Sequence, residues 1–345
     1  MSVSVIIPFW NGSQWIERAI ESVLNQTVLP DEFIIVNDGS KPEERAKLEG
    51  LAKRCRVVIL DTENGGQGAA RNHGVSHSQS EYVCFLDQDD FFLPDHIEKL
   101  RSFVGQDRPN FGFAYGSYDL ADEQGVVHVR NDLVLNQAHL HPPTRDPVEV
   151  VTRNLSILPS AAIISKRAFL AVGGFDVQFR GYEDDDLFAR MILAGFEYAY
   201  LPESVYVWCQ HKGSTTWSPT MARSRFNYYR KIRATHLVGG RLASRGLADA
   251  LADRFGRFFY KSAALSVDAG GGTSQNQDLD HFQAYVLDVA ADNLSPRLKL
   301  LFRARFWLID QTHMFPFSLI WAFKRLNRRR VAARRLRDGR QFLDG

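Results

Sequence analysis

The stretch YVCFLDQDDFFLP, residues 82–94, decides how the fold is understood. Its first part, the apolar run 82–86, predicts a buried strand. The run stops at three carboxylates, Asp87, Asp89 and Asp90, and then the chain turns apolar again. Like charges at this spacing repel one another, so the arrangement costs stability unless a cation or solvent offsets the repulsion. The stretch therefore predicts a buried strand with a polar site at its end.

Apolar patterns on both sides of this stretch alternate between strand and helix. Further β-rich runs occupy residues 3–9, 33–36 and 56–60, and a later one occupies 161–165. Between the first two runs, apolar residues recur at helical spacing over 16–24, as in an amphipathic helix. Strands separated by helices of this length are typical of a mostly parallel sheet covered on both faces. The sequence therefore predicts the α/β fold class.

Capping residues and glycines mark the expected ends of helices. Ser40 and Glu43, with Pro42 between them, predict a capped helix start. The glycine-rich segment 63–74 predicts a loop that leads into a short helix, and its glycines follow neither the P-loop nor the dinucleotide-binding pattern. The acidic cluster GYEDDD (181–186) predicts another helix start, since carboxylates favour helix N-termini.

The carboxylates at strand ends predict one ligand site. In open parallel sheets, ligands bind beyond the carboxyl ends of the strands, where we expect Asp38, Asp87 and Asp89 to meet. An Asp-x-Asp pair can present oxygens to Mg²⁺ or Mn²⁺, and a diphosphate would complete the coordination sphere. The metal would then offset charge on a departing nucleoside diphosphate. The alternative is a solvated acidic turn that caps the next helix.

Three other features have a structural explanation beside a functional one. Arg71, which follows the glycines, fits an ion pair that holds the fold. His211 fits an ordinary surface or core histidine. The acids of 181–186 fit the preference of negative charge for a helix N-terminus.

Composition limits the class of protein. The chain has 345 residues, 45% of them hydrophobic and 24% charged, as expected of a globular protein with one large domain and an extension, or with two domains. Its three cysteines, Cys55, Cys84 and Cys209, form no Cys-x-x-Cys pair, which favours a reduced, cytoplasmic chain over a disulfide framework or a zinc site. The N-terminus runs straight into a strand and lacks the basic segment of a signal peptide.

Charge divides the chain in two. Residues 1–218 contain 19 Lys and Arg against 30 Asp and Glu, a balance of −11. Residues 219–345 contain 23 against 10, a balance of +13. We therefore expect a catalytic or binding domain over 1–218 and a basic region over 219–345 that is mainly helical and lacks strands.

Basic and apolar residues are mixed in this second region. Segments 297–309 and 317–326 combine Leu, Phe, Trp and Ile with Arg and Lys, and nine basic residues lie between Lys324 and Arg340. No apolar run reaches the roughly 18 residues that a membrane span needs. Such helices fit the inner face of an anionic membrane, and the alternative is a helical bundle with a solvated basic tail. Nothing in the first region supports a nucleic-acid partner.

The order of the motifs resembles a known family, the inverting family 2 glycosyltransferases of the GT-A fold that serve bacterial polysaccharide synthesis. The matching stretches are VSVIIPFWN (3–11), VNDGS (36–40), NGGQGAARNHG (64–74), FLDQDDFFLP (85–94), VGGFD (172–176), YEDDDLFARMILAG (182–195) and HKGSTT (211–216). Each is loose alone, but together they keep the family's order over roughly residues 3–218. The resemblance implies a GT-A fold, a Rossmann-like and mostly parallel sheet flanked by helices.

The resemblance implies chemical roles at the matching positions. Asp184 matches the catalytic base, and Asp89 matches the principal ligand of Mn²⁺ or Mg²⁺. Asp87 matches the neighbour that contacts ribose or metal-bound water. His211 occupies a position that in some members binds the metal or the diphosphate.

Other matching positions are implied to contact the substrates. On the nucleotide side, Pro8, Phe9 and Asn11 line the pocket, Asp38 reads the base or ribose, and Arg71 is the basic residue near the nucleotide. The acceptor side is implied for Glu183, Gly174 and Asp185. This sequence has Asn37 where an acid is common, and its extra aspartates put the choice of Asp184 over Asp185 in doubt.

The expected function is therefore transfer of a sugar from a nucleotide-sugar, with UDP as the first expected nucleotide, to a glycan or a lipid-linked glycan. One alternative is an inactive sugar-nucleotide-binding scaffold, against which the joint presence of Asp38, Asp89 and Asp184 argues. Another is a nucleotidyltransferase of related fold, which would not need the general base of the Glu183–Asp184 pair.

Overall fold

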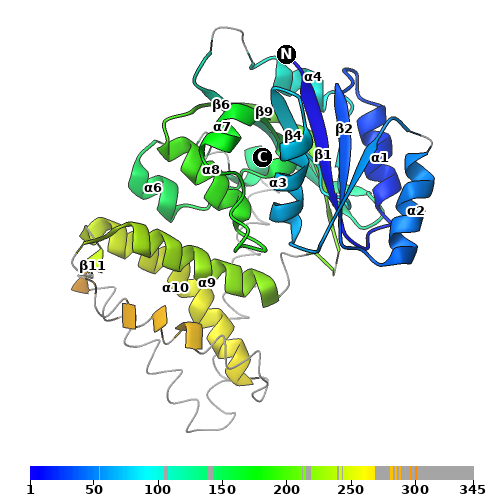
Figure 1. Ribbon diagram of the computed structural model, residues 1–345. Helices are drawn as coiled ribbons and strands as arrows, with labels where there is room; N and C mark the ends of the chain where they lie inside the picture. The colour runs from blue at the N-terminus through cyan, green and yellow to red at the C-terminus, as the bar shows by residue number, and fades with distance from the viewer. Residues whose placement is uncertain are drawn as a thin grey trace, which may run out of the picture. The chain divides into compact units, whose positions relative to one another are not determined.

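The computed structural model describes most of the first two thirds of the chain (Figure 1). The described residues are 1–53, 55–104, 108–137, 141, 143, 145–211, 213–214, 219–238, 241–242, 244–268, 280–282, 284–285, 287–288, 292, 295–296 and 300. The chain divides into two compact units, Met1–Ile232 and Arg233–Gly345.

The first unit alternates strands and helices. Its strands are β1 (Val3–Phe9), β2 (Glu32–Asp38), β3 (Val58–Thr62), β4 (Tyr82–Phe85), β5 (Phe91–Phe92), β6 (Phe111–Asp122), β7 (Val127–Val129), β8 (Ala162–Ser165) and β9 (Glu197–Gln210). Its helices are α1 (Ile16–Leu24), α2 (Pro42–Ala52), α3 (Gln67–His77), α4 (His96–Arg101), α5 (Asp132–Gln137), α6 (Pro147–Thr152), α7 (Lys166–Ala171), α8 (Glu183–Leu193) and α9 (Pro219–Thr235), whose last residues fall in the second unit.

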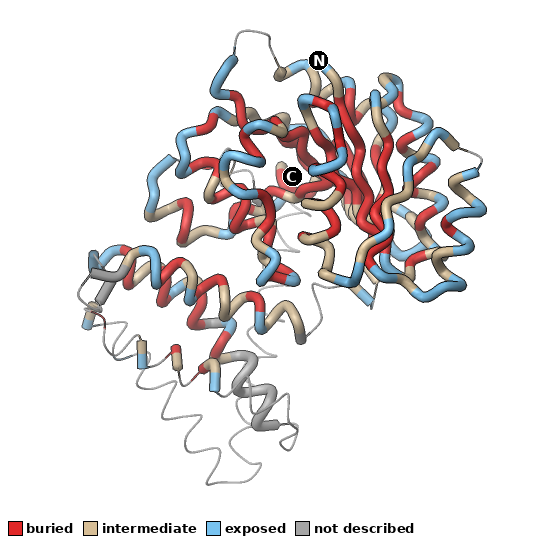
Figure 2. Tube along the Cα trace, viewed as in Figure 1, coloured by how far each residue is buried: buried red, intermediate tan, exposed pale blue. Residues whose placement is uncertain are grey.

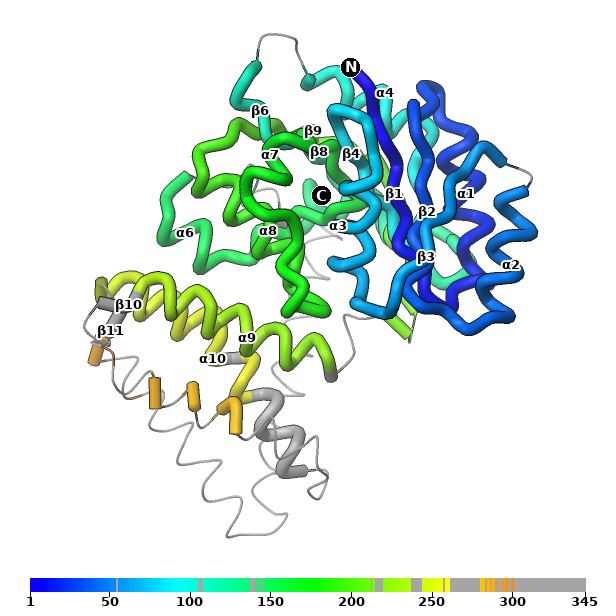
Figure 3. The backbone as a smooth tube through the Cα atoms, in the orientation of Figure 1, coloured from blue at the N-terminus to red at the C-terminus, as the bar shows by residue number. Residues whose placement is uncertain are grey.

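The strands of the first unit form one sheet in the order β3-β2-β1-β4-β8-β6-β9-β5, with β7 paired to β6. Strands β3, β2, β1 and β4 run parallel, and β9 runs parallel to β6. Strand β8 is antiparallel to both of its neighbours. Figure 3 shows β1 lying between β2 and β4. The carboxyl ends of four parallel strands therefore meet at one edge, as predicted.

The centre of the sheet is buried on both faces. All seven residues of β1 are buried, as are six of the seven in β2 (Figure 2). A Cβ at Gly74 of α3 would lie 2.5 Å from Cγ2 of Ile6 and 3.2 Å from Cγ2 of Val36. The glycine therefore lets α3 pack closely against β1 and β2. The prediction of an α/β sheet with covered faces is confirmed.

Two local predictions are wrong. The segment 63–74 is not a loop throughout, because α3 begins at Gln67 and only residues 63–66 lie outside the helix. The predicted capping box at Ser40 is also absent, since α2 begins after Lys41 without a side-chain cap. The Ser40 hydroxyl instead accepts a hydrogen bond from the backbone N–H of Asn11, 3.0 Å away. In both cases a contact distant in sequence replaces the local pattern.

The second unit is helical but contains strands, against the prediction. Short strands β10 (Leu237–Val238) and β11 (Arg241–Leu242) pair antiparallel before helix α10 (Arg245–Asp268). Except for Leu300, the segments 297–309 and 317–326 and the basic tail lie outside the described residues. Within the described part of the chain, no helix has both the length and the apolar character needed to cross a bilayer.

Candidate active site

A cleft with a volume of about 590 Å³ opens at the carboxyl ends of β1, β2 and β4. Ten of the twelve residues singled out from the sequence line it, namely Pro8, Phe9, Asn11, Asp38, Arg71, Asp87, Asp89, Glu183, Asp184 and His211. Gly174 and Asp185 do not. Residues from both ends of the first unit thus meet in one site, as the strand-end argument predicts.

Arg71 connects the two acidic motifs of the cleft. Its side chain is 1% exposed, and its guanidinium group donates to Asp87 Oδ1 and, over 3.0 Å, to Glu183 Oε1. The guanidinium carbon lies 5.2 Å from the centre of the Phe175 ring. Although burial alone would lower it, the neighbouring carboxylates raise the pKa of Arg71. Arg71 therefore joins the turn after β4 to the start of α8.

Asp89 and His211 form a second polar pair. His211 Nε2 lies 2.7 Å from Asp89 Oδ2, and the imidazole lies against Trp15 with 4.4 Å between ring centres. The hydrogen bond to Asp89 raises the pKa of His211. Asp87 is engaged with Arg71. Among the residues that the structure describes, no three His, Cys, Asp or Glu side chains form a cluster that could hold a metal ion.

The four acidic residues that begin α8 point in different directions, because successive residues of a helix are rotated by about 100°. Glu183 and Asp184 line the cleft. Asp185 faces away from it and accepts a hydrogen bond from the backbone N–H of Leu155 at 2.9 Å. Asp186 forms ion pairs with residues that do not line the cleft. The helix therefore presents Asp184, and not Asp185, to the site.

The carboxylates of the cleft are crowded. Burial, followed by the charges of Glu183 and Asp185, raises the pKa of Asp184 well above its ordinary value. Burial also raises the pKa of Asp87, with the charge of Asp89 adding to the effect and Arg71 opposing it. Raised carboxyl pKa values in a cleft are typical of functional sites, where a group must exchange a proton near neutral pH.

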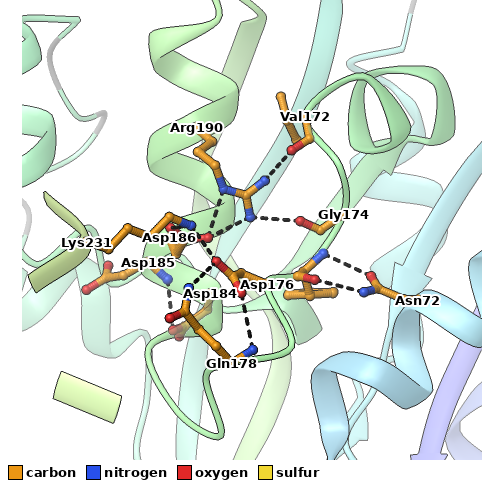
Figure 4. Close-up of polar contacts among 11 residues, drawn as sticks. Asn72, Val172, Gly174, Asp176, Gln178, Asp184, Asp185, Asp186, Arg190 and Lys231 are labelled. Atoms are coloured by element: carbon orange, nitrogen blue, oxygen red, sulfur yellow. Dashed lines mark hydrogen bonds and ion pairs between the residues drawn. The ribbon is translucent and has the colours of Figure 1, made fainter. Parts of the chain in front are cut away.

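A charged network holds the start of α8 in place (Figure 4). Arg190 donates to Asp186 over 2.8 Å and to the carbonyl oxygen of Gly174 over 2.7 Å. Lys231 Nζ, from α9, lies 2.6 Å from Asp186 and 2.7 Å from Asp176. Gly174 has a φ of +66°, so it forms a turn within this network instead of a wall of the cleft. The network fixes the helix that carries Asp184.

Two residues expected on the nucleotide side also fasten the loops around the cleft. The carboxylate of Asp38 accepts hydrogen bonds from the N–H groups of Gly65 at 2.8 Å and Gly66 at 2.9 Å. Asn11 Oδ1 accepts a hydrogen bond from Lys41 N at 2.9 Å. These bonds tie the segment before α3 to the end of β2, and the loop after β1 to the start of α2.

Gln88 is a positioning residue that sequence reasoning misses. Its side chain accepts from Trp10 N at 2.8 Å and donates to Trp10 O at 3.2 Å, which ties the end of β4 to the end of β1. A Cβ at Gly12 would lie 2.3 Å from Gln88 Cδ, so the glycine leaves room for this clamp. The middle residue of an Asp-x-Asp motif is normally treated as a spacer, and no local pattern reveals its partner.

Arg180 is a second residue that the sequence does not reveal. It lines the cleft, is exposed and lies over Gly66. A single arginine before a helix has no pattern that marks it.

Two family models match the first unit. Residues 4–164 match glycosyl transferase family 2, and residues 156–212 match a model described as the N-terminal domain of galactosyltransferase. The first match contains the Asp-x-Asp turn after β4, and the second contains the start of α8.

Curated relatives share the same part of the chain. An uncharacterized glycosyltransferase of Rickettsia conorii is 31% identical over 199 residues, which cover 55% of this chain and 31% of the relative. An uncharacterized glycosyltransferase of Haemophilus influenzae is 29% identical over 198 residues, which cover 55% of this chain and 62% of the relative. The match spans about a third or less of the length of the first Rickettsia relatives.

Solved structures share the fold. Residues 1–349 of Staphylococcus aureus TarS in complex with UDP-GlcNAc align with a TM-score of 0.61 at 17% identity, covering 90% of this chain and 89% of that one. The Pyrobaculum calidifontis mannosyltransferase PcManGT, in complex with GDP-Man and Mn²⁺, aligns with a TM-score of 0.55 at 17% identity, covering 89% and 84%. The predicted GT-A fold is thereby confirmed.

Proposed function

We propose that the chain transfers a sugar from a nucleotide-sugar to an acceptor hydroxyl with inversion of configuration, a proposal that the match of residues 4–164 to glycosyl transferase family 2 supports. The observation that carries this proposal is a single cleft lined by Asp184 and by the Asp89–His211 pair. Inverting transfer needs a base for the acceptor and a separate group of residues for the diphosphate, and this cleft contains candidates for both.

Asp184 is the general base in this proposal. Its carboxylate takes the proton of the acceptor hydroxyl while the hydroxyl oxygen bonds to the anomeric carbon of the donor sugar. The bond between that carbon and the diphosphate oxygen breaks, and its electron pair leaves with the nucleoside diphosphate. Attack opposite the leaving group inverts the configuration. The raised pKa of Asp184 supports the role, because a base with a pKa nearer the working pH accepts a proton more readily.

Asp89 and His211 are the proposed ligands of Mn²⁺ or Mg²⁺. In place of their mutual hydrogen bond of 2.7 Å, the carboxylate oxygen and the imidazole nitrogen would bind such a cation, which takes few protein ligands when it shares substrate phosphates. The bound cation would offset the charge of the departing diphosphate. Asp87, which is paired with Arg71, would contact ribose or metal-bound water.

Glu183 is the proposed contact for a substrate hydroxyl. Its Oε1 accepts from Arg71, whereas its Oε2 is buried and has no hydrogen-bond partner among the described residues. A buried carboxylate oxygen without a donor is costly. A sugar hydroxyl that enters the cleft beside Asp184 would satisfy it.

The solved structures and the charge pattern support the proposed substrate classes. The complexes of TarS with UDP-GlcNAc and of PcManGT with GDP-Man support a nucleoside-diphosphate sugar as donor, with UDP the first to test. We propose a glycan or lipid-linked glycan of surface polysaccharide synthesis as acceptor. The basic region would then bind an anionic membrane surface from the cytoplasmic side. If the chain did not bind anionic liposomes at low salt, the proposed membrane binding would be contradicted.

A thermal-shift screen tests the donor proposal. The chain is mixed with UDP, GDP and their sugars, each with and without Mn²⁺, because a ligand that binds only the folded state raises its melting temperature. We expect a shift with one nucleotide that depends on the metal and is lost in Asp89→Ala. A folded chain that shifts with no nucleotide would favour the inactive scaffold instead.

A further inference from the structure

Negative charge predominates among the side chains that line the cleft. The carboxylates are Asp38, Asp87, Asp89, Asp90, Glu183 and Asp184. The guanidinium groups are those of Arg71 and Arg180. Arg71 is already paired with Asp87 and Glu183. Among the described residues, Arg180 therefore supplies the lining guanidinium that has no carboxylate partner.

Helix α9 fixes the backbone on which Arg180 stands. The N–H of Arg180 donates to Ser224 Oγ at 3.0 Å. The next residue, Gly181, has a φ of +142°, and a Cβ there would lie 2.9 Å from Cε of Met221. Ser224 and Met221 are three positions apart on one face of α9. The main chain at Arg180 is therefore held even though its side chain is exposed.

The side chain of Arg180 lies along the turn that begins α3. A Cβ at Gly66 would lie 3.3 Å from Arg180 Nε and 3.4 Å from its Cγ. The N–H of Gly66 is occupied by Asp38. The stem of the arginine is thus supported by backbone that carries no side chain, and its guanidinium group remains at the cleft.

We propose that Arg180 binds the diphosphate group of a substrate in this cleft. The inference rests on the proposed function, because a diphosphate is part of a nucleotide-sugar donor and also of a lipid-linked acceptor. A guanidinium group offers two parallel N–H donors to phosphate oxygens, a geometry that an ammonium group cannot match. Binding breaks no ion pair of Arg180 within the described residues. The guanidinium group also supplies positive charge where the crowded carboxylates would otherwise repel the ligand.

Titration calorimetry on the full chain with Mn²⁺ tests the inference. The probes are inorganic pyrophosphate, UDP and GDP, the nucleosides uridine and guanosine, and geranyl diphosphate as a soluble isoprenoid diphosphate. The variants are Arg180→Gln and Arg180→Lys, with Arg130→Gln as the matched control, because the side chain of Arg130 is 79% exposed and lies outside the cleft. The melting temperature without ligand checks that each variant is folded.

We expect Arg180→Gln to weaken pyrophosphate binding roughly tenfold or more, as loss of a charge-assisted contact does, and to leave the nucleosides unchanged. The affinity of Arg180→Lys for pyrophosphate should lie between those of the wild type and Arg180→Gln. The affinity of Arg130→Gln should equal that of the wild type. If UDP or GDP binding weakens together with pyrophosphate binding and geranyl diphosphate binding does not, Arg180 binds the donor diphosphate. The reverse result assigns the acceptor diphosphate.

Unchanged affinity of Arg180→Gln for every diphosphate overturns the inference. A wild-type chain that binds pyrophosphate through Arg180 but binds no nucleotide keeps the inference and contradicts the proposed function. A wild-type chain that binds no diphosphate overturns both.

Discussion

Carboxylates at the two ends of the parallel strands have opposite surroundings. At the amino ends, Glu32 accepts hydrogen bonds from the hydroxyls of Ser4, Ser78 and Ser80 and from the backbone N–H of Gln79. Burial alone would raise the pKa of Glu32, but these hydrogen bonds hold it below its ordinary value. The Glu32 carboxylate at this end is therefore stabilised by hydrogen-bond donors of the protein itself.

The carboxyl ends of the same strands hold carboxylates in excess. Burial and neighbouring carboxylates raise the pKa values of Asp87 and Asp184 there. Glu183 keeps one buried oxygen without a partner among the described residues. Charge that is satisfied within the protein stabilises the fold, whereas charge left in excess is available to a cation, a proton or a substrate hydroxyl. The comparison therefore separates a structural end of the sheet from a functional one.

The largest expected effect is that of Asp184→Asn. An amide cannot accept the acceptor's proton, so we expect turnover to fall by roughly 10²- to 10⁴-fold while the melting temperature holds or rises. Turnover at saturating donor is the measurement, with Asp185→Asn as the control because that side chain faces Leu155. Wild-type turnover in Asp184→Asn would show that Asp184 is not the general base.

The next effect is that of Lys231→Met, which removes the ammonium group that pairs with Asp186 and Asp176. Breaking a partly buried ion pair should lower the free energy of unfolding by about 2 to 3 kcal/mol, and turnover should fall because the start of α8 is less well held. Urea unfolding and turnover measure the two effects, with Lys231→Arg as the conservative control. If Lys231→Met changed neither, α9 would have no part in positioning Asp184.

Glu32→Gln tests the structural end. Loss of the charged acceptor should lower the free energy of unfolding by about 1 to 2 kcal/mol at pH 7 and leave turnover unchanged. Because the folded pKa of Glu32 is lowered, its contribution is present above the unfolded pKa and is lost as the pH falls through the folded one. The difference from the wild type should therefore shrink in acid. Glu49→Gln, at a largely exposed side chain, is the control, and a loss of turnover in Glu32→Gln would contradict the comparison.

The smallest effect is a displacement of the pH profile. The value of kcat/KM should fall as the pH drops through the raised pKa of Asp184, because the protonated acid cannot act as a base. The acid limb should thus lie above the ordinary aspartate pKa of about 3.9. Removing one neighbouring charge in Glu183→Gln should move the limb to lower pH. If kcat/KM instead fell near the ordinary aspartate pKa, neighbouring carboxylates would not raise the pKa of Asp184 in the working enzyme.

Local sequence patterns are enough to predict β1, β2 and β4 and the meeting point of their carboxyl ends. The runs that become β1, β2 and β4 are apolar because these strands are buried, and parallel strands must end at one edge. The same reasoning fails for 63–74, where glycines suggest a loop. Gly74 lies inside α3, where Ile6 leaves no room for a Cβ, and a Cβ at Gly68 would crowd Phe175 at 3.3 Å. Glycine there reflects close packing, which a local pattern does not distinguish from a turn.

The sequence by itself determined the α/β class, the order of the motifs and the carboxylates at the strand ends, since each depends on residues close together in the chain. Only the tertiary structure decided how those carboxylates are used. Arg71 contacts Glu183, and Lys231 contacts Asp186. The partners are so far apart in sequence that the periodicity of a helix or a strand cannot predict the contacts. The direction of each acid in α8 likewise depends on which neighbour packs against that side of the helix. Asp184 faces the cleft because the network of ion pairs holds its helix in that orientation.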